Sequence, residues 1–174
     1  AQVSACNKLY KRELFNELKY PEGRSHEDTF VIIKLLLECQ KVVIDPNVRY
    51  YYYHRDDSII TKKLSLADYD LIEASQANYE LVKDNYPSAL KQAEMRVLWS
   101  HFWLLDKAII AEDSTLKDKT IKAEVEYLKQ HYSQIISNPY LEVKRVKAMK
   151  VLKHSYPLYC LLVQLRQRKK KPNE

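Results

Sequence analysis

Residues 26–37, His-Glu-Asp-Thr-Phe-Val-Ile-Ile-Lys-Leu-Leu-Leu, place two acids directly before a nearly continuous apolar run. The preceding Tyr20-Pro21-Glu22-Gly23 contains the only glycine of the chain. Because proline presets φ and glycine accepts positive φ, this tetrapeptide predicts a turn. Glu27 to Gln40 then predicts a helix that is apolar on almost every side and therefore buried.

The acids Glu27 and Asp28 at the start of this helix have two interpretations. Negative charge in a first helical turn is favourable by roughly 0.3–1 kcal/mol, so the pair can be purely structural. A carboxylate at the rim of a cleft can also act as a general base. The motifs that flank the pair favour the second interpretation.

Composition narrows the class of protein. The 174 residues suit one domain, or one domain with a small second one, and 46% hydrophobic residues can fill a core. A charged fraction of 30% with one glycine favours long helices. The net charge of +6 permits binding to phosphates, nucleic acid or an anionic membrane and selects none of them.

Three scattered cysteines indicate reduced core thiols in a cytoplasmic protein. No apolar run reaches the roughly 18 residues of a membrane span, and Ala1 leads us to expect a piece of a longer protein.

The hydrophobic pattern changes near Lys63. Before it, we expect a short helix at 11–18, the buried helix, and two paired strands at 41–45 and 48–55, which belong to a larger sheet. After it, the apolar spacing is helical only. We expect helices ending before Pro87, from about Ser88 to Ile110 (the central core helix), from Ser114 or Thr115 to Ile135, from Asn138-Pro139 to the break at 155–157, and over the leucine-rich last segment. The predicted fold is α+β and predominantly helical, with domains at 1–63 and 64–174.

Several chemistries find little support. A single glycine excludes a P-loop or a Rossmann fingerprint. The histidines are far apart and no HExxH occurs, so a zinc site is not expected, and His101 and His131 are interpreted as ordinary helix residues. Asp56-Asp57 could ligate a metal, but such a pair before a serine is more often a loop or a cap.

Four motifs in order resemble the second half of bacterial family-2 glycosyltransferases, which build surface polysaccharides from nucleotide sugars. They are Asn-Lys-Leu-Tyr-Lys-Arg-Glu-Leu-Phe at 7–15, Pro-Glu-Gly at 21–23, Glu-Asp at 27–28, and Tyr-Tyr-Tyr-x-Arg-x-x-Ser-Ile at 51–59. The resemblance is specific over about residues 5–62 and general beyond. It implies an inverting transferase whose α/β nucleotide-sugar half, with an Asp-x-Asp motif holding a divalent metal (Mg or Mn), precedes Ala1. The two-strand and helix part would be the remnant of that half, and no cofactor is expected in this piece itself.

The resemblance also implies roles for single residues. Asp28 would be the catalytic base with Glu27 beside it. The segment 51–59 would place His54, Arg55 and Ser58 near the donor diphosphate. Some relatives use a histidine of this region on the metal, although many have another residue where His54 stands. Further substrate contacts are expected from three residues, namely Asn7, Lys8 and Tyr52; Asn7 as a helix cap and Lys8 as a structural residue are the alternatives.

Arginine and metal chemistry fit an inverting transfer. The acceptor hydroxyl needs a base, and the departing diphosphate needs positive charge on the other side of the sugar carbon. The parent would take a nucleotide-sugar donor and a glycan or lipid-linked acceptor, and this piece alone is expected to be inactive.

The last segment suggests a separate partner. Leucines at 158–165 followed by basic residues through 171 fit an interfacial helix on an anionic membrane, or a solvated helix end. We therefore expect a cytoplasmic protein, with the inner face of the membrane as a second location and no nucleic acid. The rival function is a non-catalytic helical adaptor that binds membrane or nucleic acid through this tail.

Overall fold

The computed structural model describes residues 4–51, 53 and 63–168, and over these residues the chain is predominantly helical. Seven α-helices form within them, together with short 3-10 helices. The α-helices are α1 (Glu27–Leu37), α2 (Asp70–Asn85), α3 (Leu90–Ile110), α4 (Thr115–Gln130), α5 (Tyr132–Ser137), α6 (Val143–His154) and α7 (Tyr156–Arg168). The 3-10 helices include η1 (Ala5–Asn7), η2 (Arg12–Phe15), η4 (Leu66–Tyr69) and η5 (Pro87–Ala89).

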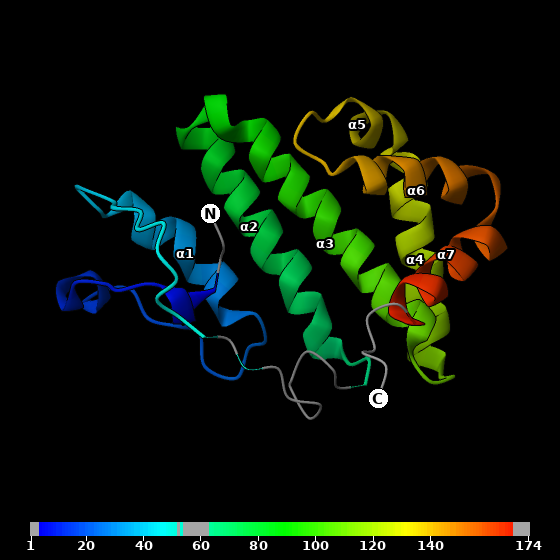
Figure 1. The fold of residues 1–174 in the computed structure, drawn as a ribbon, viewed down its shortest axis with the longest axis horizontal. Coiled ribbons are helices and arrows are strands. Elements are labelled where there is room, and N and C mark those ends of the chain that lie inside the picture. Colours follow the sequence, from blue (N-terminus) through cyan, green and yellow to red (C-terminus); the bar gives the residue numbers. More distant parts are fainter. Residues whose placement is uncertain (1–3, 52, 54–62, 169–174) are drawn as a thin grey trace.

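Helix α3 divides the molecule into two sides (Figure 1). Helix α2 packs along one side of α3, and α1 packs on α2. Helices α4 and α7 pack on α3, while α5 and α6 complete that second side. The N-terminal segment and the candidate site therefore lie on one side of α3, and the C-terminal helices lie on the other.

The core confirms the central role expected for the helix at 90–110. Phe102, Leu104 and Leu105 in the middle of α3 are fully buried. Side chains of α4 to α7 close over Phe102 and Leu105 in one cluster, which includes Leu128, Ile135, Met149, Leu152 and Tyr159. A fully buried side chain of this size contributes about 1.5–3 kcal/mol, so this cluster is the main source of stability on the second side.

One half-buried carboxylate, that of Asp106, holds α6 and α7 to α3. Asp106 of α3 accepts a hydrogen bond from the Tyr159 hydroxyl at 2.7 Å and forms an ion pair with Arg145. Burial and the neighbouring Asp106 raise the pKa of Tyr159, so its hydroxyl remains a donor. The Arg145 guanidinium also lies over the ring of Phe102, 5.4 Å from its centroid, within the range of a cation–π contact.

The predicted strands at 41–45 and 48–55 are wrong for the residues described, because 41–51 form no strand and no ladder. The segment runs as an irregular chain whose Val43, Ile44 and Val48 are 77%, 87% and 92% exposed. Strand residues need partners for their backbone groups, and an isolated pair is barely stable. The sequence pattern is that of strands, yet nothing in the described residues offers them a sheet.

Three helix boundaries also differ from the expectation. The helix expected at 11–18 is only the 3-10 turn η2. The helix expected to end at Ile135 is divided at His131 into α4 and α5. Asn138 does not cap a helix starting at Pro139; it is buried and its amide donates to the Lys91 carbonyl at 2.9 Å.

The predicted cap of α4 is confirmed. Ser114 precedes the helix, and its hydroxyl oxygen accepts a hydrogen bond from the Lys117 amide at 3.1 Å. Such a bond satisfies one of the amides that a helix start leaves unpaired. The domain boundary near Lys63 stays a prediction.

We expect Tyr159→Phe to lower the free energy of unfolding by about 1.5–3 kcal/mol, because it removes a hydrogen bond to a charged group in the interior. Tyr140→Phe is the matched control, since Tyr140 is 51% exposed and should change stability by less than about 0.5 kcal/mol. Urea unfolding of both variants measures the difference. Equal losses of unfolding free energy in the two variants would mean that the hydrogen bond from Tyr159 to Asp106 does not stabilise the fold.

Candidate functional site

The start of α1 is held in place by hydrogen bonds to α2. The Ser25 amide donates to the Asp70 carboxylate at 2.8 Å, and Arg24 pairs with the same carboxylate at 3.2 Å. The Asn78 side chain donates to the carbonyl of Thr29 at 2.7 Å. Polar side chains of α2 therefore fix the first turn of α1, and with it the position of Asp28.

The chain enters α1 through an unusual backbone conformation. Gly23 has φ of 71°, and His26, directly before the helix, has φ of 55°. No other non-glycine residue among those described has a positive φ. Residues held in this region cost of order 1–3 kcal/mol and gather at functional sites. The strained residue lies two positions before the predicted base.

Asp28 is half-buried in the first turn of α1 and accepts a hydrogen bond of 3.3 Å from the Thr29 hydroxyl. Its negative charge acts on ionisable side chains from several other elements, so it is the electrostatic centre of this region. Those side chains are Lys8, Tyr10, Tyr20, His26 and Arg96. We call these five residues and Asp28 the Asp28 cluster.

Two phenols of the cluster are kept protonated. Burial raises the pKa of Tyr10, and Tyr20 and Asp28 raise it further. Burial likewise raises the pKa of Tyr20, and Asp28 adds to the effect. The Tyr10 hydroxyl is buried next to Tyr20, whose proximity also raises its pKa. A protonated phenol can donate a hydrogen bond to a ligand oxygen.

Lys8 approaches Asp28 from the N-terminal segment. Its ammonium donates to the Ser4 carbonyl at 2.6 Å and to the Asn7 side chain at 2.7 Å. Burial lowers the pKa of Lys8, while Asp28 opposes the shift. Asn7 accepts a hydrogen bond from Lys8 through its side-chain oxygen, and the predicted contact of both residues with the acceptor stays a prediction.

Helix α3 contributes the other side of the cluster. Arg96 is half-buried, with its guanidinium 5.0 Å from the centroid of Trp99, and burial lowers its pKa against the opposing effect of Asp28. His26 packs edge-on against Trp103, with ring centroids 5.1 Å apart. The Gln92 side-chain oxygen, one turn before Arg96, is buried without a partner in the part of the chain that the structure describes. Helix α3 thus places a cation, Arg96, within the field of Asp28 and an aromatic ring, Trp103, against His26.

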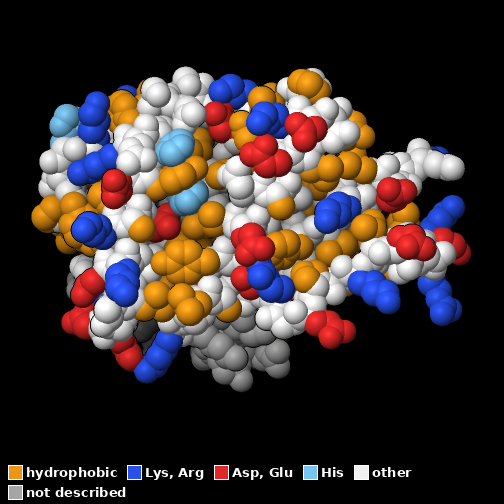
Figure 2. Space-filling view, turned by 180° about the vertical axis from the view of Figure 1, so that it is seen from behind, with side chains coloured by type: hydrophobic (Ala, Val, Ile, Leu, Met, Phe, Trp, Pro, Cys, Tyr) orange, Lys and Arg blue, Asp and Glu red, His pale blue; other side chains and the backbone are white. Residues whose placement is uncertain are grey.

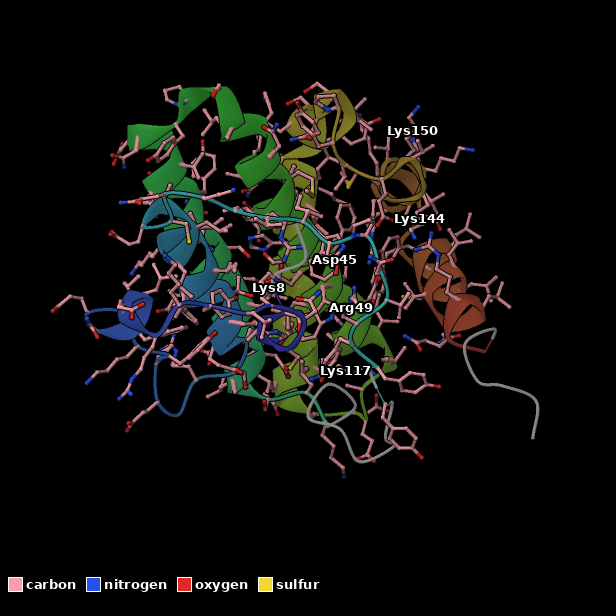
Figure 3. The ribbon with its side chains drawn as sticks, turned by 60° about the vertical axis from the view of Figure 1, so that its left-hand side comes forward. Lys8, Asp45, Arg49, Lys117, Lys144 and Lys150 are labelled. Atoms are coloured by element: carbon pink, nitrogen blue, oxygen red, sulfur yellow. The ribbon has the colours of Figure 1, made fainter. Side chains whose placement is uncertain are left out.

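The other predicted site residues are less informative. Glu27 is exposed, beside Asp28 in the same turn. Tyr52, His54, Arg55 and Ser58 lie outside the described residues, so the predicted proximity of Asp28 and Arg55 stays a prediction. Figure 3 shows Lys8 on the same side of the molecule as Asp45 and Arg49, which form an ion pair of 2.9 Å in the segment 41–51.

No group of three or more His, Cys, Asp or Glu side chains among the described residues is arranged to hold a metal ion. The resemblance places the metal ligands ahead of Ala1, so the expected Mg or Mn of the parent stays a prediction. The chemistry available at the Asp28 cluster is proton transfer and hydrogen bonding.

Sequence reasoning identified Asp28 and Lys8 but missed Tyr10, Tyr20 and Arg96. Tyr10 belongs to the motif at 7–15, and its position two residues after Lys8 was the available signal. Tyr20 opens the turn before α1 and was interpreted only as a turn residue. Arg96 is one of many charged helix residues, and only tertiary packing brings it toward Asp28.

A second polar cluster lies between α3 and α4. His101 is buried and its Nδ1 is 2.6 Å from the carboxylate of Glu124. The Tyr127 ring stacks on His101, with ring centroids 3.5 Å apart. It also stacks on His131, with centroids 3.9 Å apart. His101 is a helix residue, as interpreted, and ties α3 to α4, whereas His131 lies at the break between α4 and α5.

Two surface hollows are lined by residues other than Asp28. One of about 430 Å³ is lined by α4 residues and Tyr156, and one of about 550 Å³ by Tyr69 and residues of α2. The space-filling view shows apolar and charged side chains alternating over the back of the molecule (Figure 2). Neither hollow is lined by a residue of the Asp28 cluster, so the candidate site rests on its polar groups.

No protein-family model matches the chain, and neither a curated protein nor a solved structure matches it significantly.

The environment of His26 predicts a pH dependence of stability. Burial lowers the pKa of His26, and Lys107 contributes to the lowering, while Asp28, Asp68 and Glu27 oppose it. The unfolded state therefore binds the proton more readily than the folded state. The contribution of neutral His26 to stability is therefore complete above the pKa of about 6.5 that the residue has in the unfolded chain. It is lost as the pH falls through the lower pKa of the folded state.

We expect the free energy of unfolding to decline between about pH 7.5 and about pH 5.5, and to decline less in His26→Asn. Asparagine tolerates the left-handed backbone that this position requires. His154→Asn is the control, because His154 is exposed. Denaturant unfolding at several pH values gives the slopes. Parallel curves for wild type and His26→Asn would exclude His26 as the source.

Proposed function

We propose that this chain is the acceptor side of an inverting glycosyltransferase, with Asp28 as the base that deprotonates the acceptor hydroxyl. The observation that carries the proposal is the position of Asp28, which is half-buried in the first turn of α1, two residues after the strained His26. Its negative charge there also raises the pKa of Tyr10 and Tyr20. A carboxylate with protonated phenols in its field suits a ligand with several hydroxyl groups. The parent would transfer a sugar from a nucleotide-sugar donor to a glycan or lipid-linked acceptor in bacterial surface polysaccharide synthesis.

The division of labour in the cluster follows from the protonation states. Asp28 is the acceptor for a proton, and its place at the positive end of α1 favours its charge. Tyr10 and Tyr20 remain protonated and donate hydrogen bonds to the oxygens of the acceptor sugar. Lys8 supplies a positive charge next to Asp28. General-base catalysis of this kind contributes typically 10²–10⁴-fold.

The exposed segment 41–51 supports a larger catalytic domain. Val42, Val43, Ile44 and Val48 are β-prone apolar residues with large exposed fractions. In the proposed parent they would complete the sheet of the nucleotide-sugar half and lose that exposure. The proposal assigns the diphosphate contacts to His54, Arg55 and Ser58, with the divalent metal held by that other half.

The alternative proposal is a non-catalytic helical adaptor that binds a membrane or nucleic acid. It uses the basic C-terminal part of the chain and assigns no chemistry to Asp28. The half-buried position of Asp28 directly after a strained backbone favours the enzyme, because strained residues gather at functional sites.

In the parent transferase we expect Asp28→Asn to lower kcat by about 10²–10⁴-fold, because the amide cannot accept the acceptor proton. Binding of the nucleotide-sugar donor should be unchanged. Release of the nucleoside diphosphate with acceptor present measures kcat, and calorimetric titration measures donor affinity.

The matched control is Glu38→Gln, which removes an exposed acid at the other end of the same helix. Its kcat should stay within about twofold of wild type, as expected of a surface change. Near-normal transfer by Asp28→Asn, with donor binding intact, removes Asp28 from the base role. An equal loss in both variants would assign the effect to the stability of α1.

A further inference from the structure

Charge is distributed very unevenly along the chain. Ten of its 29 lysines and arginines lie between residues 143 and 171, a stretch that contains no Asp or Glu. Residues 1–142 hold 22 of the 23 acids, so this part has a formal charge of −3 while 143–174 has +9. The positive charge of the protein is therefore a property of α6, α7 and the end of the chain.

Helix α7 has two apolar faces, and only one of them is used in the core. Tyr159 and Val163 are buried against the rest of the bundle. Leu158, Leu161 and Leu165 are 47%, 49% and 43% exposed. Their spacing of three and four residues places them along one stripe of the helix. An exposed leucine stripe on a helix whose other face is already buried requires an explanation beyond folding.

Helix α6 packs against α7 and presents lysines outward. Ala148, Met149 and Leu152 of α6 are buried, while Lys147 and Lys150 are exposed. Figure 3 shows Lys150, and Lys144 of the same helix, at the outer edge of the molecule on the side that α7 occupies. The two adjoining helices thus carry exposed lysines on α6 and exposed leucines on α7, which together give an amphipathic, cationic surface.

We propose that Leu158, Leu161 and Leu165 together with Lys147 and Lys150, the α6–α7 face, bind the surface of a bilayer containing anionic phospholipid. Leucine side chains enter the boundary between headgroups and acyl chains, and lysines remain at the level of the lipid phosphates. Nucleic acid fits this surface less well. A phosphate backbone would use the lysines but has no place for three leucines, and single strands select aromatic platforms.

The mode of binding is peripheral. No helix within residues 4–51, 53 and 63–168 has both the length and the apolarity that a bilayer crossing requires. The α6–α7 face lies on the opposite side of α3 from the Asp28 cluster (Figure 1). The proposal does not depend on the proposed sugar transfer, and its test measures no transferase activity.

The experiment is co-sedimentation of the 174-residue chain with vesicles of equal parts phosphatidylglycerol and phosphatidylcholine, and with vesicles of phosphatidylcholine alone. We expect binding to the anionic vesicles that weakens as salt is added. Lys147→Gln/Lys150→Gln should lower the partition coefficient by about 10- to 30-fold, given the attraction of each basic residue near an anionic surface. Leu161→Asn should lower it by about 3- to 10-fold through lost apolar burial.

Matched variants on the other side of α3 serve as controls. Lys34→Gln/Lys83→Gln removes the same charge from exposed positions of α1 and α2, and Leu66→Asn replaces a leucine that is 74% exposed. Both should bind as wild type does. Circular dichroism and urea unfolding check that each variant is folded, as expected from substitutions at exposed positions.

Three outcomes would overturn the proposal. The first is absence of binding to anionic vesicles by the folded wild-type chain. The second is equal loss in the α6–α7 variants and their controls. The third is binding to a single-stranded oligonucleotide that outcompetes the vesicles and responds to the lysine variant but not to Leu161→Asn, which would assign the face to nucleic acid.

Discussion

The structure depends on burying α3 from two sides at once. Phe102, Leu104, Leu105 and Ala108 have no exposed surface, and they are covered by α2 on one side and by the C-terminal helices on the other. A helix with apolar residues on several sides is stable only when it is buried, and one partner helix cannot cover all of that surface. Every other helix is positioned by its place along α3.

The same helix also contributes polar groups to each side. On one side, Trp103 packs against His26 and Arg96 lies within the field of Asp28. Asp106 faces the C-terminal helices and holds α6 and α7. Because both sets project from one rigid helix, the candidate site and the α6–α7 face keep fixed positions without touching each other.

The helices could be predicted from sequence because their signal is local. Apolar residues at steps of three and four define α2, α3 and α4, and Ser114 marks the start of α4. The strands at 41–55 could not, because β-prone residues such as Val43 and Ile44 become a strand only when another strand pairs with them. Asn138 was misassigned for a similar reason. Its side-chain amide donates to the distant carbonyl of Lys91, whereas its sequence position favours capping a helix that begins at Pro139.

The candidate site shows the same division between local and distant signals. Asp28 and Lys8 were named from motifs, whereas Arg96 reaches the site only through the packing of α3, which no spacing rule encodes. Charge is likewise divided between the two sides. The first 142 residues are net negative and the last 32 strongly positive, so the proposed base and the proposed membrane-binding face lie in parts of the chain with opposite net charge. Because effects of separated, non-contacting residues are additive, substitutions on the α6–α7 face should leave the Asp28 cluster unperturbed. A chain arranged in this way would bind a membrane surface with one side, as proposed, while the other side would remain available to the proposed acceptor.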